Sequence, residues 1–509
     1  MNTSQRVVKN TAYLYIRTIV SLLVSVFTTR ILLQALGVSD FGLYNLIGGV
    51  IAMLGFVSSA MSGVTLRFLS YAEGAEDKSR TISYFANSVI IHRILALLMI
   101  LVLAIVGVCF FNGILNIPHG QMGAAIVIYV CTVVSTVFSI TIAPYDAAIN
   151  AHECMLFYSV LGILDVLFKF GIAVAVYWLD DNRLVFYAVL MMFESFLLRF
   201  ITQMYCRRKY EECRHLKLRQ QYNRQIVKEM TSFAGWNMAN VATGMFSLYG
   251  MNVVANHFFG THINAAMAIA TQLSGVIMGI SLNMIKAISP VIVKSAGSNQ
   301  HDNMLKMSYA GCKFSYLLFS FAGIPVIVFL KPILSLWLTV VPDWTWIFCV
   351  ILLAASLVEQ LTLALYQSII AVGNIRGYML CRSVVNIAPI LISITMYLWH
   401  DFSPVWIYIN YGIAKSIITG IVNVWYAHLK LEYDVAYFLT KIVLPCSVAT
   451  LVSLFICMAC KYCTEIYSVH FVFSLAICFV SSIIIYWFVA LEQSEKSVIK
   501  SILVRLKPC

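Results

Sequence analysis

Charged residues are scarce in this sequence. Of its 509 residues only 11% are charged while 61% are hydrophobic, and the mean hydropathy is +0.87. A soluble domain carries about 25% charged residues. The chain therefore lacks the polar groups that would cover its surface in water, and we expect lipid to cover it instead. This excludes an ordinary soluble enzyme or binding domain.

Motifs that bind nucleotides or carry catalysis are also missing. The sequence contains no P-loop, no G-x-S-x-G elbow, no H-E-x-x-H and no GxGxxG in a strand–helix setting. We therefore expect no catalytic residues, no ATP hydrolysis and no cofactor. Fourteen cysteines are scattered through apolar stretches, and the C-x-x-C-x-x-C at 457–463 lacks a fourth ligand. We interpret them as small apolar residues rather than as a metal site.

Long apolar stretches fill most of the chain. A bilayer-spanning helix needs about 20 mostly apolar residues, and fourteen stretches meet this length. They predict an all-α polytopic membrane protein. The first stretch contains arginines and is too long for a signal peptide, so we expect it to be a transmembrane helix. The fourteen stretches are 12–35, 42–64, 84–110, 121–144, 156–178, 184–205, 230–256, 266–290, 306–330, 346–372, 379–400, 405–427, 441–461 and 469–490.

Positive charge is distributed unevenly between the loops. With the N-terminus inside, the cytoplasmic segments hold most of the loop Lys and Arg, whereas the outer loops hold only Arg183, Lys331 and Lys461. This follows the positive-inside rule, so we expect both termini in the cytoplasm. The outer loops are short, which disfavours a glycosyltransferase or polymerase. Six tryptophans lie near the predicted outer boundary, as in an aromatic belt: Trp178, Trp337, Trp344, Trp346, Trp399 and Trp406.

The two halves of the chain resemble each other at an offset near 220 residues. For example, LGVSDFGLYN after the first span matches FGTHINAAMA after the seventh. Six spans per repeat predict two parallel lobes around a central cavity, which is where such repeats place a substrate. We therefore expect an N-terminal six-helix lobe at 1–205, a basic cytoplasmic linker at 206–228, a C-terminal six-helix lobe at 229–428, and two additional helices with a cytoplasmic tail at 429–509.

Nine Lys and Arg residues lie inside the apolar stretches, against three acids. An ionised group in hydrocarbon is costly and usually faces a wet cavity or a partner. An excess of buried positive charge therefore predicts a cavity for an anionic substrate. Those near span ends, including Arg17 and Arg30, can instead snorkel to the interface. The candidate cavity cations are Arg17, Arg30, Arg93, Lys169 and Lys415, and the remaining bases are Arg199, Lys286, Lys313 and Arg382.

The three buried acids are candidates for coupling transport to an ion gradient. Asp165 and Lys169 lie four residues apart on one helical face, where they can form an ion pair. Either this pair stays neutral, or protonation of Asp165 frees the Lys169 ammonium to bind a substrate. Glu194 and Glu359 have no partner on their own helices. They either exchange protons or bind sodium, or they pair with a buried base across helices.

Two equivalent spans carry a stripe of polar residues on one helical face. Such stripes either line a cavity or form hydrogen bonds between helices. We take both stripes as candidate cavity lining. The first span contributes Asn10, Ser21 and Thr28 beside Arg17, and the seventh contributes Asn237, Asn240 and Ser247.

Several segments resemble bacterial polysaccharide repeat-unit flippases. The segments are VVKNTAYLYIRTIVSLLVSVFTTRILLQALGVSDFGLYNLIGGV, MSGVTLRFLSYAEG, APYDAAINAHECMLFYSVL, ILSLWLTVVPDW and AVGNIRGY. These flippases form the O-antigen and exopolysaccharide branch of the multidrug/oligosaccharidyl-lipid/polysaccharide flippase superfamily. The resemblance covers essentially the whole chain, and Arg17 and Arg30 lie within its N-terminal part.

The resemblance implies alternating access in the bacterial cytoplasmic (inner) membrane. The implied substrate is an oligosaccharide on a polyprenyl pyrophosphate, whose negative charge the cavity cations would attract. The expected partners are membrane lipids, a polysaccharide polymerase and a chain-length regulator, with no role for nucleic acid. The product would serve a surface polysaccharide such as lipopolysaccharide. The alternatives are a multidrug or cation antiporter of the same superfamily and a flippase for a lipid-linked peptidoglycan precursor.

Overall fold

The computed structural model describes residues 3–53, 55–111, 122–214, 216, 218–259, 261–338, 341–467, 471–493 and 495–497. Within these residues every regular element is helical and no strand occurs. The predicted all-α class is confirmed. Its physical cause is the apolar composition, since a backbone in lipid finds hydrogen-bond partners only within itself and a helix provides them. Lys217, Gly260 and the tail from 498 onward lie outside the described residues.

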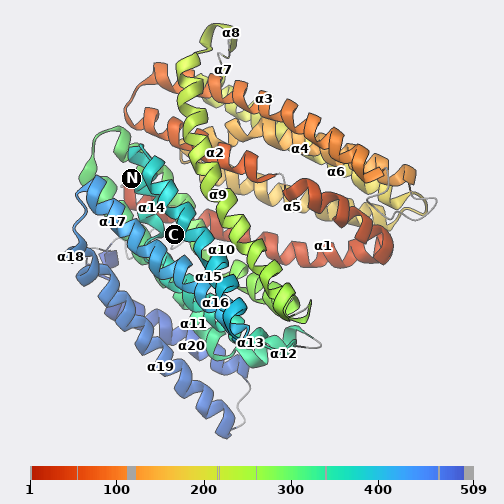
Figure 1. Ribbon diagram of the computed structural model, residues 1–509. Helices are drawn as coiled ribbons and strands as arrows, with labels where there is room; N and C mark the ends of the chain where they lie inside the picture. Colours follow the sequence, from red (N-terminus) through yellow and green to blue (C-terminus); the bar gives the residue numbers. More distant parts are fainter. Residues whose placement is uncertain are drawn as a thin grey trace, which may run out of the picture. The chain divides into compact units, whose positions relative to one another are not determined.

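The chain divides into two compact units, which are described separately below. The N-terminal unit comprises Lys9–Met238, and the C-terminal unit comprises Ala239–Cys509 together with Met1–Val8. Along the chain, the unit changes twice, first after Val8 within α1 (Thr3–Met53) and again after Met238 within the long helix α9 (Arg224–Phe259) (Figure 1).

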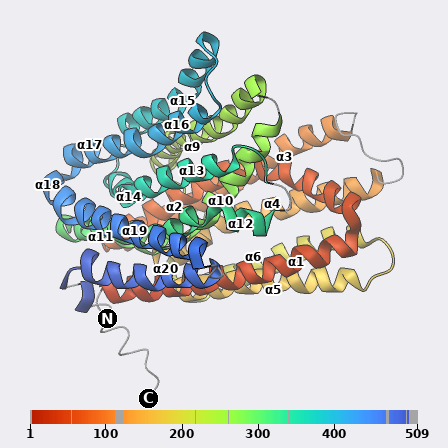
Figure 2. The same cartoon turned by 90° about the horizontal axis from the view of Figure 1, so that it is seen from below.

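The N-terminal unit is a helical bundle in which α2, α3, α4 and α6 pack on one another. Figure 2 shows α1, α5 and α6 running side by side. Small residues permit such close approach of helices in membranes. Gly107 of α3 faces the ring of Tyr129 of α4, whose hydroxyl donates to the Leu103 carbonyl. The helices are α1 (Thr3–Met53), α2 (Gly55–Gly74), α3 (Lys78–Cys109), α4 (Met122–Ala151), α5 (Met155–Tyr177), α6 (Arg183–Lys209), α7 (Glu211–Arg214) and α8 (Leu218–Gln221).

One glycine bends the long helix α1. Gly37 adopts φ 74° and ψ 173°, which is not a helical conformation and which residues with a Cβ rarely adopt. The first predicted span, 12–35, lies before this residue. The second, 42–64, begins after it and continues from α1 into α2.

The C-terminal unit contains the remaining helices, joined by pairs of hydroxyl side chains. Such pairs satisfy polar groups that would otherwise face hydrocarbon. Ser308 pairs with Ser368, and Ser320 with Tyr486 at 2.7 Å. The helices are α10 (Thr261–Gly297), α11 (His301–Val328), α12 (Leu330–Trp337), α13 (Thr345–Gln360), α14 (Leu363–Val372), α15 (Arg376–Trp399), α16 (Val405–Ile413), α17 (Thr419–Leu431), α18 (Val435–Phe438), α19 (Leu444–Tyr467) and α20 (Phe471–Ile485), with π-helical turns η2 (Ala414–Ile418), η3 (Leu439–Val443) and η4 (Tyr486–Ala490).

Eleven helices among the described residues are long and apolar enough to cross a membrane, or twelve if one bent pair counts as a span. The other two predicted spans, 42–64 and 230–256, fall on α1–α2 and on α9. A multi-pass membrane protein is thus confirmed, while a count of fourteen stays a prediction. The predicted span 346–372 was wrong in one respect, because it consists of α13 and α14 bent by 45°.

The six predicted boundary tryptophans all have exposed side chains. Trp178 is 78% exposed beside the end of α5, and Trp399 is 84% exposed at the end of α15. An amphipathic ring at a helix end suits the boundary between lipid and water. The remaining four, also exposed, are Trp337, Trp344, Trp346 and Trp406.

Candidate functional site

A polar cavity lies within the N-terminal unit, between α1, α4, α5 and α6. Its volume is about 340 Å³. Six ionisable side chains from these four helices line it, which is an unusual concentration for a membrane-embedded site. They are Arg17, Asp146, Asp165, Lys169, Glu194 and Arg199.

Arg17 is held in the cavity by an aromatic ring and a glycine. Its guanidinium carbon lies 4.6 Å from the centre of the Tyr158 ring. A Cβ atom on Gly162, one turn further along α5, would lie 1.8 Å from the Arg17 Nε. The Arg17 side chain therefore occupies the space that a side chain at position 162 would fill.

Arg199 is held in a similar way, 5.4 Å above the ring of Phe138. Within the described part of the chain, neither Arg17 nor Arg199 has a carboxylate at salt-bridge distance. A guanidinium on an aromatic face keeps its donors directed away from the ring. The two arginines can therefore offer hydrogen bonds to an anion in the cavity.

One acid of the cavity is paired with its only ammonium group. The Lys169 Nζ lies 2.7 Å from one Asp165 oxygen and 2.9 Å from the other, which is the ion pair expected from their spacing. Glu194 is 5% exposed and lines the same cavity. Ser195 Oγ donates to Glu194 Oε2 at 3.5 Å, while Oε1 has no partner among the described residues.

Asp146 is an acidic cavity residue that sequence reasoning missed. The predicted span ended at 144, so Asp146 fell in the segment after it. In the structure Pro144 lies inside α4, which continues to Ala151 and carries Asp146 into the cavity. The count of three acids in the apolar stretches was therefore too low. In this cavity three bases face three acids, so the predicted excess of positive charge does not hold here.

Three of the five predicted cavity cations do not line this cavity, and one of them, Lys415, belongs to the other unit. Arg30 of α1 and Arg93 of α3 both have exposed side chains. The three polar residues of the α1 stripe differ in burial and in their hydrogen-bond partners. Asn10 is buried, whereas the hydroxyl of Thr28 donates to the Val24 carbonyl of its own helix. Ser21 is half-buried. A substrate-binding role for these residues stays a prediction.

The C-terminal unit has a smaller and mostly apolar cavity of about 170 Å³. Lys415 lies at its edge, on the π-helical turn η2. Its Nζ lies 3.3 Å from Glu359 and donates to Ser356 Oγ at 3.2 Å. The predicted pairing of Glu359 with a buried base across helices is what the structure shows. π-Helical turns are often found at functional sites.

The predicted repeat, with its offset near 220 residues, matches Glu194 to Lys415. They stand 221 residues apart, close to the offset of the internal match, and lie on α6 and on η2 after α16. One repeat thus places an acid where the other places a base. The two cavities therefore differ in charge as well as in volume.

The remaining buried bases have neighbours of their own. Arg382 donates to the Tyr378 hydroxyl at 3.2 Å and to Asn423 Oδ1 at 3.1 Å, so it does not snorkel. Lys313 is 3% exposed and pairs with Glu495 at 2.7 Å. Lys286 also has an interaction partner.

The second polar stripe mainly joins helices. Asn237 donates to the Ala60 carbonyl at 3.4 Å, and Asn240 accepts from Asn386 at 3.2 Å through its carbonyl. Ser247 is 2% exposed, and its hydroxyl has no partner in the described part of the chain. Among the described residues, no group of three His, Cys, Asp or Glu side chains is placed to hold a metal ion.

Solved structures with this fold are transporters. One is the outward-facing conformation of a multidrug resistance MATE family transporter of the MOP superfamily, with a TM-score of 0.70 and 13% identity over 85% of this chain and 98% of that one. Another is a MOP superfamily transporter from Pyrococcus furiosus, with a TM-score of 0.66 and 12% identity over 85% and 100%. At these identities the likeness shows the fold alone.

Sequence relatives identify the family. The chain is 30% identical over 105 residues to the "Uncharacterized membrane protein EpsK" of Bacillus subtilis (strain 168), and this match spans only 20% of each chain. Residues 7–296, more than half of the chain, match the family described as "Polysaccharide biosynthesis protein". The chain therefore belongs to the polysaccharide biosynthesis protein family, as the resemblance found in its sequence predicted.

Proposed function

We propose that this protein moves polyprenyl-pyrophosphate-linked oligosaccharide repeat units from the cytoplasmic to the outer leaflet of a bacterial inner membrane. It would do so by alternating access, with both termini in the cytoplasm and without enzymatic chemistry. The expected partners are the lipid-linked oligosaccharide, membrane lipids, a polysaccharide polymerase and a chain-length regulator. Family membership supports a role in polysaccharide synthesis, and the cavity of the N-terminal unit supports an anionic substrate.

The observation that carries the proposal is the pair of arginines without carboxylate partners in that cavity. Arg17 and Arg199 are held over aromatic rings, and their donors suit the oxygens of a pyrophosphate or an acidic sugar. Ligand pockets usually measure about 300–1,000 Å³. The cavity of about 340 Å³ is at the small end of that range, so it suits a charged headgroup rather than a whole repeat unit.

The acids of the cavity supply a means of changing its charge. Asp165 and Glu194 line the same small cavity, where the negative charge of each disfavours ionisation of the other, so we infer that the two carboxyls hold one proton between them. With one proton on Asp165 and Glu194, the three bases outnumber the charged acids by one, and the cavity favours an anion. Loss of that proton makes the cavity neutral and favours release. Proton coupling through Asp165 and Glu194 is therefore part of the proposal, with sodium as the alternative ion and Glu359 as the third candidate.

An antiporter for cationic drugs is the second candidate. The multidrug resistance MATE transporter that shares the fold motivates it. A cationic substrate would need a net negative cavity, whereas Arg17 and Arg199 repel cations.

A flippase for a lipid-linked peptidoglycan precursor is the remaining alternative. Its substrate is also an anion that Arg17 and Arg199 would bind, and it would differ by making the gene essential.

The proposal is tested by removing the two arginine charges. Arg17→Gln and Arg199→Gln would be expressed in a strain lacking the gene, with Lys306→Gln as a control that removes an exposed base far from the cavity in sequence. We expect both arginine variants to reduce surface polysaccharide at least tenfold at equal protein level, and the control to export normally. Normal export by both arginine variants would contradict the assignment of the cavity.

A further inference from the structure

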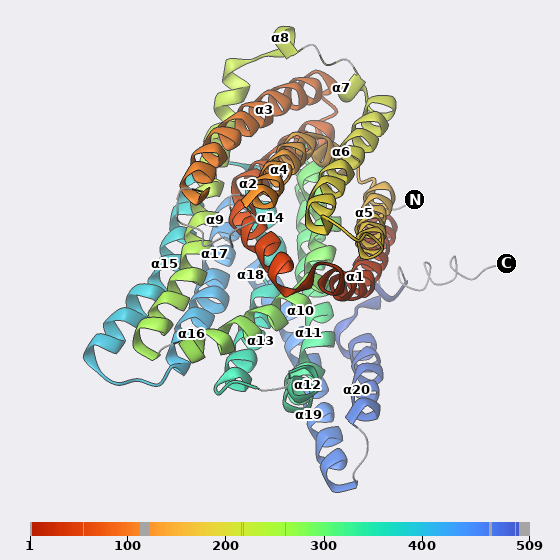
Figure 3. The same ribbon diagram turned by 90° about the vertical axis from the view of Figure 1, so that its right-hand side faces the viewer.

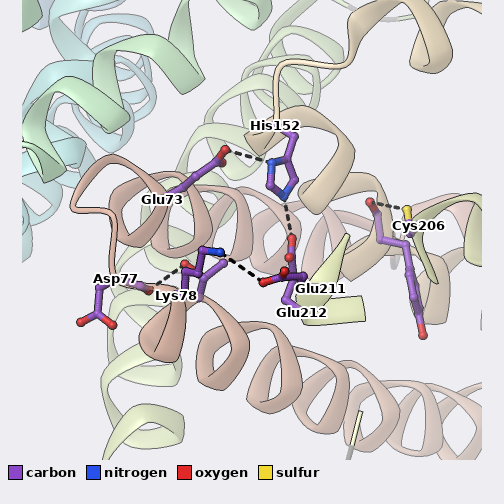
Figure 4. Close-up of polar contacts among 9 residues, drawn as sticks. Glu73, Asp77, Lys78, His152, Cys206, Glu211 and Glu212 are labelled. Carbon is purple, nitrogen blue, oxygen red and sulfur yellow. Dashed lines mark hydrogen bonds and ion pairs between the residues drawn. The ribbon is translucent and has the colours of Figure 1, made fainter. Parts of the chain in front are cut away.

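The basic linker, residues 206–228, is an ordered part of the N-terminal unit. Its helices α7 and α8 pack against α3, and α7 also packs against α6 (Figure 3). His152, in the turn between α4 and α5, joins α7 to the membrane helices (Figure 4). Its Nδ1 lies 2.9 Å from Glu73 of α2, and its Nε2 lies 2.6 Å from Glu212 of α7.

A second set of contacts fixes the other end of the linker. Asn87 of α3 donates to the Gln221 carbonyl at 3.0 Å and accepts from the Asn223 backbone N–H at 3.0 Å. The Asn223 side chain in turn accepts from the Gln225 N–H at 2.9 Å, at the start of α9. The linker is therefore held at α7 and after α8, so its surface is presented in a defined arrangement.

These contacts use the acids of the linker and leave its bases exposed. Glu212 is paired with His152, and Glu211 lies 3.4 Å from Lys78 of α3 (Figure 4). In the described part of the chain, none of the seven exposed bases of the linker forms a salt bridge. They are Arg207, Arg208, Lys209, Arg214, Arg219, Arg224 and Lys228. The linker surface therefore carries a concentrated positive charge that its own acids do not neutralise.

We propose that the basic linker docks on the headgroups of anionic phospholipids in the leaflet on its own side of the membrane. The linker follows α6 directly, and the last turn of α6 already contains Arg207, Arg208 and Lys209. Clusters of four to eight bases next to a transmembrane helix bind anionic lipid, because each base near the surface is attracted by its negative potential. The exposed ring of Tyr222, 53% accessible, suits the same interface.

This docking is independent of which substrate the protein transports. A soluble acidic partner is the competing occupant of the surface. Lipid is favoured because Arg207, Arg208 and Arg214 lie at or just after the end of α6, and Arg224 and Lys228 lie at the start of α9. Headgroups at these helix ends are inside the screening length of about 10 Å at 0.1 M salt. The His152 contacts keep the bases in place before lipid binds, so little ordering accompanies binding.

The test measures lipid binding to the full-length protein in detergent by native mass spectrometry. The probes are phosphatidylglycerol and phosphatidylcholine. Arg208, Arg219 and Arg224 are changed together to Gln, and the matched control changes the same three to Lys. We expect the affinity for phosphatidylglycerol to fall about 100-fold in the Gln variant, or about fivefold per charge removed, and to persist in the Lys variant.

Four results would overturn the proposal. They are equal binding of the two lipids by the unmodified protein, unchanged phosphatidylglycerol binding in the Gln variant, an equal loss in the Lys variant, and displacement of the lipid by polyglutamate at equal charge concentration. If the Gln variant does not fold, the unmodified protein decides the question in a salt series. Phosphatidylglycerol affinity that is constant between about 0.05 and 0.5 M salt would then contradict an electrostatic contact.

Discussion

At the residue scale, the position of Arg17 depends on a neighbouring glycine. Gly162→Ala would place a Cβ 1.8 Å from the present Arg17 Nε and force the guanidinium off the Tyr158 ring. We expect at least a tenfold loss of polysaccharide export, with the protein still folded. Gly171→Ala is the matched control, because a Cβ at this position of the same helix meets nothing within 4 Å. Equal export by the two variants would show that the placement of Arg17 is not needed.

The sequence allowed some residues of the cavity to be predicted and not others. Arg17, Asp165, Lys169 and Glu194 could be found because a charge in an apolar run is conspicuous. Asp146 could not, since the predicted apolar stretch ended before it at 144, whereas the helix continues to Ala151. Partners from distant segments, such as Glu495 for Lys313, follow from packing and leave no local pattern.

His152 is expected to make stability depend on pH. Burial lowers its pKa, but hydrogen bonds to Glu212 and Glu73 outweigh burial and raise the pKa to about 9. The unfolded value is about 6.5, so the stabilisation is fully present below pH 6.5 and is lost as pH rises through 9. A shift of this size corresponds to roughly 3 kcal/mol.

The measurement is the thermal unfolding midpoint of purified protein between pH 6 and 9.5. His152→Gln should remove the part of the pH dependence that lies between about 6.5 and 9, because Gln carries no ionisable group. Curves of the same shape for the two proteins would show that the imidazolium does not hold α7 in place.

At the scale of elements, the bend of α1 requires glycine at 37. With φ at 74° and no neighbouring atom within 4 Å of an added Cβ, the effect of Gly37→Ala comes from backbone strain alone. We expect a loss of about 1–3 kcal/mol in stability. Gly63→Ala, in the regular helix α2 with the same open surroundings, should be neutral or slightly stabilising. Denaturant titrations of the two variants would check this, and equal midpoints would contradict the strain.

Helix positions were easier to predict than helix ends and bends. The described residues of the apolar stretches are almost all helical, because lipid allows little else. The bend between α13 and α14 was not visible, since 346–372 contains no proline or glycine to mark it. The basic linker was recognised by its charge, but its fixed arrangement depends on His152 and Asn87, which belong to other segments.

At the scale of the whole molecule, the fold is that of solved transporters and the family is one of polysaccharide synthesis. Structural neighbours of about 13% identity share the architecture, and the family assigns the chain to polysaccharide synthesis. Among transporters with one fold, the substrate depends on the charge of the site. The proposed flippase function therefore depends on an anionic, lipid-linked sugar entering a site that contains Arg17 and Arg199.

The most direct test analyses the membrane lipids of a strain that lacks this gene. If the account is correct, polyprenyl-pyrophosphate-linked oligosaccharide accumulates on the cytoplasmic face while surface polysaccharide is lost, and the mass of the trapped lipid identifies the glycan. Normal surface polysaccharide without accumulation, together with new sensitivity to cationic drugs, would contradict the flippase and support the antiporter.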